Sequence, residues 1–132
     1  HFDDGEAMGL ENPHIRIHQV PGNCDKYRMY QSHPETLCYP VCGVELFMTH
    51  GHRHAVKQLL SLLLQDAWEA EVDAVLYGHT HIADCHQEED GLWVLNPGSA
   101  GYNGGSAGIL ETDGQCVTAC YLLTQQDLEE IV

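Results

Sequence analysis

The stretch of this chain with the most readable chemistry is Gly78-His79-Thr80-His81, which carries two imidazoles two residues apart. It follows residues 72–77, an apolar run whose length and composition predict a short buried strand. Side chains of an extended segment alternate between faces, so His79 and His81 point the same way if the strand geometry continues. Neutral imidazoles at a strand end are suitable metal ligands, although two exposed loop histidines would give the same letters.

A matching motif, Thr49-His50-Gly51-His52, comes at the end of a second apolar run, residues 44–49, which also predicts a strand. Apolar residues then recur at helical spacing from Val56 to Trp68, which predicts a helix with a buried stripe. Strand, helix and strand in this order predict a crossover between parallel strands. Because the carboxyl ends of parallel strands share one edge of a sheet, we expect the histidines of the two motifs side by side.

The remaining elements are predicted from periodicity and turn residues. Alternation over 14–20 predicts a strand with Ile15 and Ile17 facing the core. The other expected elements are a hairpin of 36–41 with 44–49, an acidic turn over 84–90, a strand over 92–95, a hairpin of 108–112 with 115–122, and a helix over 125–131. No helix or strand is expected at the opening residues, so the chain is expected to begin in mid-fold.

The composition limits the classes of function that the chain can have. It has 20 acidic and 5 basic residues, a net charge of −15, so it lacks the basic surface with which proteins bind nucleic acids. An anionic phosphate ester would therefore need positive charge from bound metal. No apolar run is long enough to span a membrane. The six cysteines are expected to be reduced and the protein cytoplasmic, because the Leu-rich helix can build a core without disulfides.

Four motifs follow one another along the chain: Gly22-Asn23-Cys24-Asp25, Thr49-His50-Gly51-His52, Gly78-His79-Thr80-His81 and Asn96-Pro97-Gly98-Ser99. In this order they resemble the calcineurin-like metallophosphoesterase superfamily, in particular its small YfcE-like phosphodiesterases. The resemblance covers essentially the whole chain. It implies one α/β domain over 1–132, a sandwich of two β-sheets flanked by helices, lacking the first strand and helix and the D-x-H motif that they carry.

The resemblance also implies roles for single residues at two divalent metal ions. Asp4, expected at a strand end, matches the carboxylate that bridges the ions. Asn23, His50 and His79 match ligands of one ion, and His81 matches a ligand of the other. Mn²⁺ is the expected metal, with Ni²⁺, Zn²⁺, Fe²⁺ and Mg²⁺ as alternatives.

Three further positions are less defined. His52 follows a ligand within its motif and has no assigned role. Cys24 is interpreted as a small residue packed beneath the site, in preference to a nucleophile. The turn that begins at Asn96 is either adjacent to the site, as the resemblance implies, or simply a turn after a strand.

The implied function is hydrolysis of phosphodiester bonds in a small phosphate ester, with a dinuclear metal centre and a metal-activated water. The alternative is a catalytically impaired protein-binding scaffold of the same fold, as in a similar retromer subunit. A histidine-rich storage protein is a third interpretation, but His14, His18, His52 and His54 are expected at exposed positions. An uncovered sheet edge would also favour a homo-oligomer.

Overall fold

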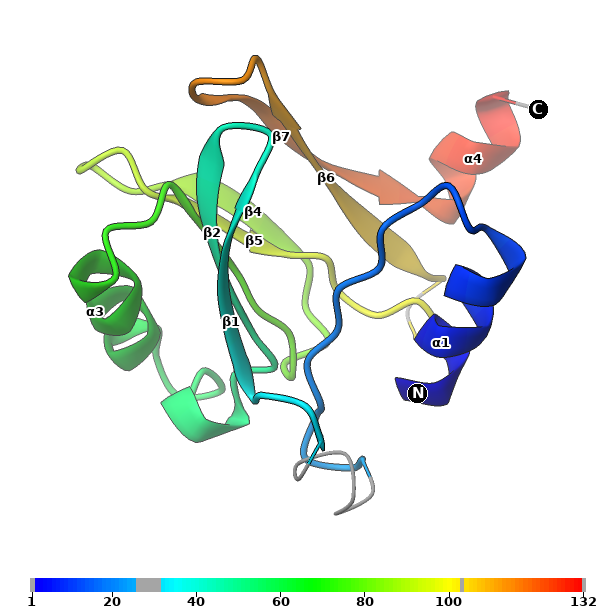
Figure 1. Ribbon diagram of the computed structural model, residues 1–132, viewed down its shortest axis with the longest axis horizontal. Coiled ribbons are helices and arrows are strands. Elements are labelled where there is room, and N and C mark those ends of the chain that lie inside the picture. The colour runs from blue at the N-terminus through cyan, green and yellow to red at the C-terminus, as the bar shows by residue number, and fades with distance from the viewer. Residues whose placement is uncertain (1, 26–31, 103, 132) are drawn as a thin grey trace.

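The computed structural model describes residues 2–25, 32–102 and 104–131. Its main feature is a five-stranded mixed sheet with the strand order β1-β2-β3-β5-β4. These strands are β1 (Thr36–Val41), β2 (Val44–Thr49), β3 (Ala74–Leu76), β4 (Asp84–Gln87) and β5 (Trp93–Asn96). β2, β3 and β5 are parallel, and β1 and β4 pair antiparallel at the two edges. Figure 1 shows this sheet between α3 and a second, two-stranded sheet.

The two faces of the large sheet follow from side-chain alternation. On one face Phe47, Val75 and Val94 lie in register across β2, β3 and β5 and pack with Leu63 and Ala67 of α3 (Ser61–Glu69). On the other face Leu46 and Ala74 pack with the second sheet, which consists of β6 (Ser106–Thr112) and β7 (Val117–Thr124). The predicted mixed α/β sandwich of two sheets with helices outside is therefore confirmed.

Both predicted hairpins are confirmed, and their turns touch. β1 and β2 are joined at Cys42 and Gly43, whose positive φ angles of 47° and 84° suit a tight two-residue turn. A side chain at Gly43 would collide with the backbone of Gly114, in the turn between β6 and β7. The Thr112 hydroxyl donates a hydrogen bond to the Cys42 carbonyl (3.2 Å) across the same contact.

The connection between β2 and β3 differs from the predicted helix over 56–68. A 3-10 turn, η1 (His52–His54), is followed by Ala55 in a left-handed conformation (φ 52°), and α3 begins only at Ser61. Leu59 and Trp68, expected in the buried stripe, are 54% and 69% exposed. The parallel crossover itself is confirmed, because β2 and β3 pair in parallel. Leu63 and Ala67 of the connecting helix bury against the sheet.

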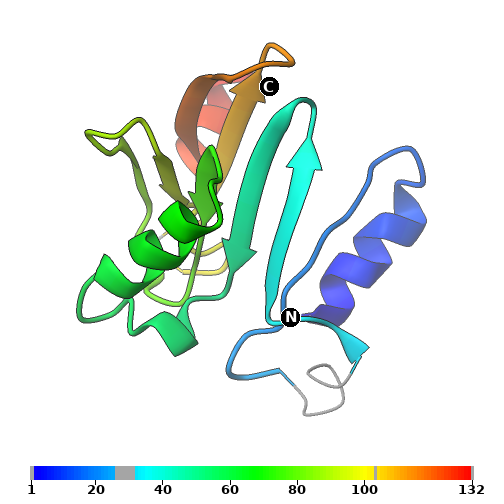
Figure 2. The same cartoon turned by 60° about the vertical axis from the view of Figure 1, so that its left-hand side comes forward.

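The amino-terminal prediction is wrong. Residues 14–20 form no strand, and within the described residues their backbone makes no ladder of hydrogen bonds with a neighbouring strand. Instead α1 (Phe2–Glu11) packs against this segment, with Gly9 against Ile17, and His18 stacks on Tyr39 of β1 at 4.3 Å. Ile15 remains 50% exposed. Figure 2 shows the segment running beside β1.

Two further elements complete the chain. β4 replaces part of the predicted acidic turn over 84–90. The predicted helix over 125–131 is confirmed as α4 (Gln125–Ile131), and Thr124 and Asp127 cap it reciprocally, each bonding the other's backbone N–H. No helix in the described part of the chain is long and apolar enough to cross a membrane.

A disulfide between Cys85 of β4 and Cys120 of β7 joins the two sheets, with the Cα atoms 6.6 Å apart. The prediction that all cysteines are reduced is therefore wrong for this pair. The two cysteines lie on strands of different sheets, 35 residues apart, and only the packing of the sheets brings them together. The other four cysteines are free and exposed (Cys24, Cys38, Cys42 and Cys116).

Candidate metal centre

The carboxyl ends of β2 and β3 lie side by side and carry the two histidine motifs, as the crossover predicts. The Gly78 amide donates a hydrogen bond to the His50 carbonyl (3.0 Å), which ties the two loops together just beyond the strands. The ring centroids of His50 and His79 are 4.9 Å apart, and both side chains are half-buried. This pair is the centre of the candidate site.

His52 joins the pair. Its Nδ1 atom lies 3.1 Å from Nδ1 of His50, and its ring centroid is 6.2 Å from that of His79. The turn that carries Asn23 comes close through its neighbour Gly22, because a Cβ added to Gly22 would lie only 2.9 Å from Cδ2 of His50, while Asn23 itself is exposed. The turn is closed by the Asp25 carboxylate, which accepts a hydrogen bond from the Gly22 amide (2.6 Å).

The electrostatics keep this cluster unprotonated at neutral pH. Burial, followed by the neighbouring His79 and His52 rings, lowers the pKa of His50 from 6.5 to about 4. The pKa values of His52 and His79 are also lowered, in each case first by burial. Neutral imidazoles retain the nitrogen lone pair that a metal ion needs.

His79 and His81 have different ring partners. The strand ends at Leu76, and both histidines have left-handed backbones with φ of 70° and 59°, so strand alternation does not continue. His79 meets His50, whereas the exposed His81 stacks on Tyr102 of the Gly-rich loop (5.1 Å between centroids, 12° between planes). The strand geometry on which the expected shared direction depended therefore does not continue to His79 and His81.

Asp4 is not at a strand end. It lies in the first turn of α1, on an exposed position of that helix. Within the described residues, no three His, Cys, Asp or Glu side chains are arranged so that they could hold one metal ion. The structure therefore brings together His50, His79, His52 and the Asn23 turn, and does not assemble the complete two-ion ligand set.

Two other expectations at the site are corrected. Cys24 is exposed in its turn and does not pack beneath the site. His54, expected on the surface, is buried (9% exposed); its Nε2 lies 2.8 Å from the Asp66 carboxylate and its buried Nδ1 has no hydrogen-bond partner among the described residues. Sequence spacing gave no signal for this pair, because Asp66 lies 12 residues away on α3.

The turn after β5 is both a turn and a neighbour of the site. Asn96 is completely buried, and its Oδ1 accepts a hydrogen bond from the Gly98 amide (2.9 Å). Gly98 has φ 80°, and a Cβ there would clash with Ser106. The turn therefore requires glycine at this position.

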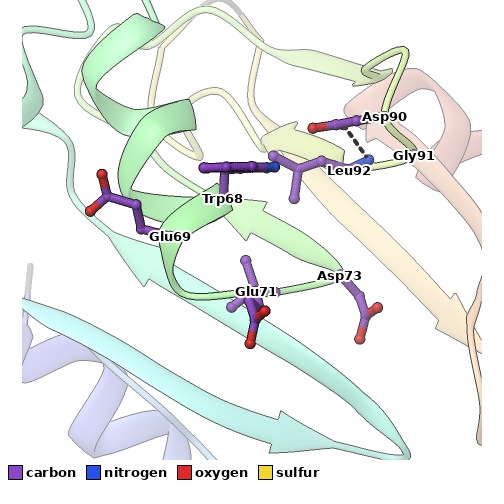
Figure 3. Close-up of a pocket in the computed structure, with 8 residues that line it drawn as sticks. Trp68, Glu69, Glu71, Asp73, Asp90, Gly91 and Leu92 are labelled. Carbon is purple, nitrogen blue, oxygen red and sulfur yellow. Dashed lines mark hydrogen bonds between the residues drawn. The ribbon is translucent and has the colours of Figure 1, made fainter.

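A separate cavity of about 480 Å³ lies at the opposite end of the parallel strands, before β3 and β5 (Figure 3). It is lined by the exposed Trp68 and by four carboxylates, Glu69, Glu71, Asp73 and Asp90, the last of which accepts a hydrogen bond from the Leu92 amide (3.0 Å). This charge repels a phosphate ester, so the histidine edge is the better candidate for phosphate chemistry.

The domain model of the calcineurin-like phosphoesterase superfamily matches residues 5–115 of the chain, a span that includes all four motifs. The chain belongs to this superfamily. The match begins one residue after Asp4.

Curated relatives of this chain agree with the family assignment. Over 102 residues it is 34% identical to the probable metallophosphoesterase YsnB of Bacillus subtilis, and over 113 residues 32% identical to the phosphodiesterase YfcE of Escherichia coli. These alignments cover 75% and 79% of the chain but only 56% and 57% of the relatives, so the chain spans a little over half of their length.

A solved structure supports the fold. Vps29 of Entamoeba histolytica, in a complex with Zn²⁺, has a TM-score of 0.68 over 90% of this chain and 75% of Vps29, with 22% identity. At this identity the similarity shows the fold alone.

Proposed function

We propose that this protein is a metal-dependent phosphodiesterase that acts on a small phosphate ester. The observation that carries the proposal is the meeting of His50 and His79, 4.9 Å apart, at the carboxyl edge of the parallel strands. This is the edge where open α/β sheets bind ligands. The relatives named metallophosphoesterase and phosphodiesterase support the same reaction class.

The residues present fit one divalent ion. With its pKa near 4, His50 is neutral at pH 7, and the nearby His79 offers a second imidazole. The resemblance assigns a third ligand, the amide oxygen of Asn23, which is exposed beside Gly22. Two imidazoles and an amide oxygen suit Mn²⁺ and also Ni²⁺, Zn²⁺ or Fe²⁺, whereas Mg²⁺ prefers oxygen ligands alone.

A second ion, the other half of the proposed dinuclear centre, would use Asp4 and His81. The observations support the first ion more strongly, because Asp4 lies on α1 and His81 is stacked against Tyr102. When bound, divalent ions neutralise the phosphate charge and lower the pKa of a water ligand.

The chain itself offers little positive charge for a phosphate. Its net charge is −15. Near the histidines, Arg53 is engaged by the Glu35 carboxylate through two hydrogen bonds of 2.9 and 3.2 Å. Lys57 also lies near the cluster, because its charge helps to lower the pKa of His79, so the site would orient the ester through this side chain together with a metal ion.

The proposal is tested by loading the protein with Mn²⁺ and measuring hydrolysis of bis(p-nitrophenyl) phosphate. We expect metal-dependent turnover that is lost in His79→Ala and retained in His14→Ala, a matched change at an exposed histidine. A protein that binds Mn²⁺ but hydrolyses no phosphodiester would contradict the catalytic proposal. Failure to bind Mn²⁺ would indicate the alternative, a scaffold with an impaired metal site.

A further inference from the structure

The buried side chain of Asn96 connects the turn after β5 to the histidine loop after β3. Its Nδ2 atom donates hydrogen bonds to the Thr80 hydroxyl (2.9 Å) and to the Gly78 carbonyl (3.4 Å). Its Oδ1 atom is fixed from the other side by the Gly98 amide (2.9 Å). Asn96 is 0% exposed, so these partners replace the water that its amide would otherwise bind.

The two acceptors of the Asn96 amide lie on either side of His79. His79 has φ 70°, a conformation that residues with a side chain rarely adopt without support. The Thr80 hydroxyl also accepts a hydrogen bond from the Ile82 amide (3.1 Å), so the same oxygen restrains the chain on both sides of His81. The loop is thus held by side chains where the β-ladder has ended.

We propose that Asn96 and Thr80 are positioning residues that hold His79 in its left-handed conformation, facing His50. This assigns a reason for the threonine between the two histidines and for the asparagine that opens the Asn96-Pro97-Gly98-Ser99 turn. The consequence for metal affinity rests on the proposed function, but the geometric part does not. The Gly78 amide reports on the geometry, because it donates to the His50 carbonyl across the two loops (3.0 Å).

Thr80→Val tests this positioning with little change of shape, because it replaces the hydroxyl with a methyl group of similar size. Thr80→Ser keeps the hydroxyl and should rescue the loss. Thr112→Val is the matched control: the Thr112 hydroxyl also makes two hydrogen bonds to backbone groups, to the Cys42 carbonyl (3.2 Å) and from the Gly114 amide (3.1 Å), but at the distant hairpin turns. Asn96→Ala is less suitable because the site is completely buried.

Two readouts separate the possible outcomes. In the metal-free protein, hydrogen exchange of the Gly78 amide should accelerate about tenfold in Thr80→Val and return toward the wild-type rate in Thr80→Ser, while Thr112→Val leaves it unchanged. By calorimetry, Mn²⁺ affinity should fall about tenfold in Thr80→Val, the range expected for a residue that orients a ligand.

Unchanged Gly78 exchange in Thr80→Val would overturn the inference. Changed exchange with unchanged Mn²⁺ affinity would overturn the link from the loop to the metal. If the wild-type protein binds no Mn²⁺, the proposed function fails, and the exchange measurement still decides whether Thr80 positions the loop.

Discussion

Acidification from pH 7 to pH 5 is expected to destabilise this protein through His50. In the unfolded chain this side chain has an ordinary pKa of 6.5, and in the folded chain burial and the rings of His79 and His52 lower the pKa to about 4. The proton therefore binds more tightly to the unfolded chain. The stability that neutral His50 permits is complete above pH 6.5 and is lost as the pH falls toward 4.

The magnitude follows from proton linkage at a single site. With pKa values of 6.5 and about 4, the free energy of unfolding falls between pH 7 and pH 5 by about 2 kcal/mol, an order-of-magnitude figure. Replacing His50 with asparagine removes the titration of this side chain. It also removes the contribution of the His79 and His52 rings to the lowered pKa of His50. All other titrating groups are present in both proteins. The difference between the wild-type protein and the variant therefore reports on His50 and the rings around it.

The measurement is urea unfolding at both pH values for the wild-type protein, His50→Asn and His14→Asn. The loss of stability between pH 7 and pH 5 should be about 2 kcal/mol smaller in His50→Asn than in the wild-type protein. His14→Asn, at an exposed position, should lose as much stability as the wild type. Equal losses in all three proteins would refute a buried, neutral His50.

Three other outcomes are expected. Leu63→Ala, at a completely buried position of α3, should lower the free energy of unfolding by about 3 kcal/mol in urea titrations, and a change below 1 kcal/mol would contradict the assigned core. Without reductant, four of the six cysteines should react with a thiol reagent in denaturant, whereas six would contradict the Cys85–Cys120 pair. On a sizing column the protein should elute as an oligomer, at an apparent mass above 14.7 kDa, because Ile15 and Ile17 are 50% and 38% exposed. Ile15→Glu should weaken this self-association, and a monodisperse wild-type monomer would count against it.

The parallel core and the meeting of His50 with His79 could be predicted from the sequence. Both depend on the periodicity of single strands and helices and on the rule that a strand-helix-strand unit pairs its strands in parallel. Strand, helix and strand require a crossover, and a crossover places both carboxyl ends at one edge. The different ring partners of His79 and His81 could not be predicted in this way. They arise from two positive φ angles that alternation does not encode.

The amino-terminal errors have a different cause. Alternation over 14–20 is compatible with a strand, but a strand also requires a partner for its backbone, which periodicity does not supply. α1 contains Gly5 and Gly9, which lower helix propensity, yet their lack of side chains lets the helix approach Gln19 and Ile17. Packing overrides propensity here, so Asp4 is placed on a helix.

The central claim, that His50 and His79 hold a divalent ion, is tested most directly by calorimetric titration of Mn²⁺ into the wild-type protein, His79→Ala and His81→Ala. The account predicts binding by the wild-type protein, at least tenfold weaker binding by His79→Ala, and a smaller loss in His81→Ala, whose ring stacks on Tyr102 whereas that of His79 meets His50. Absence of binding by the wild-type protein, or a larger loss in His81→Ala than in His79→Ala, would contradict it.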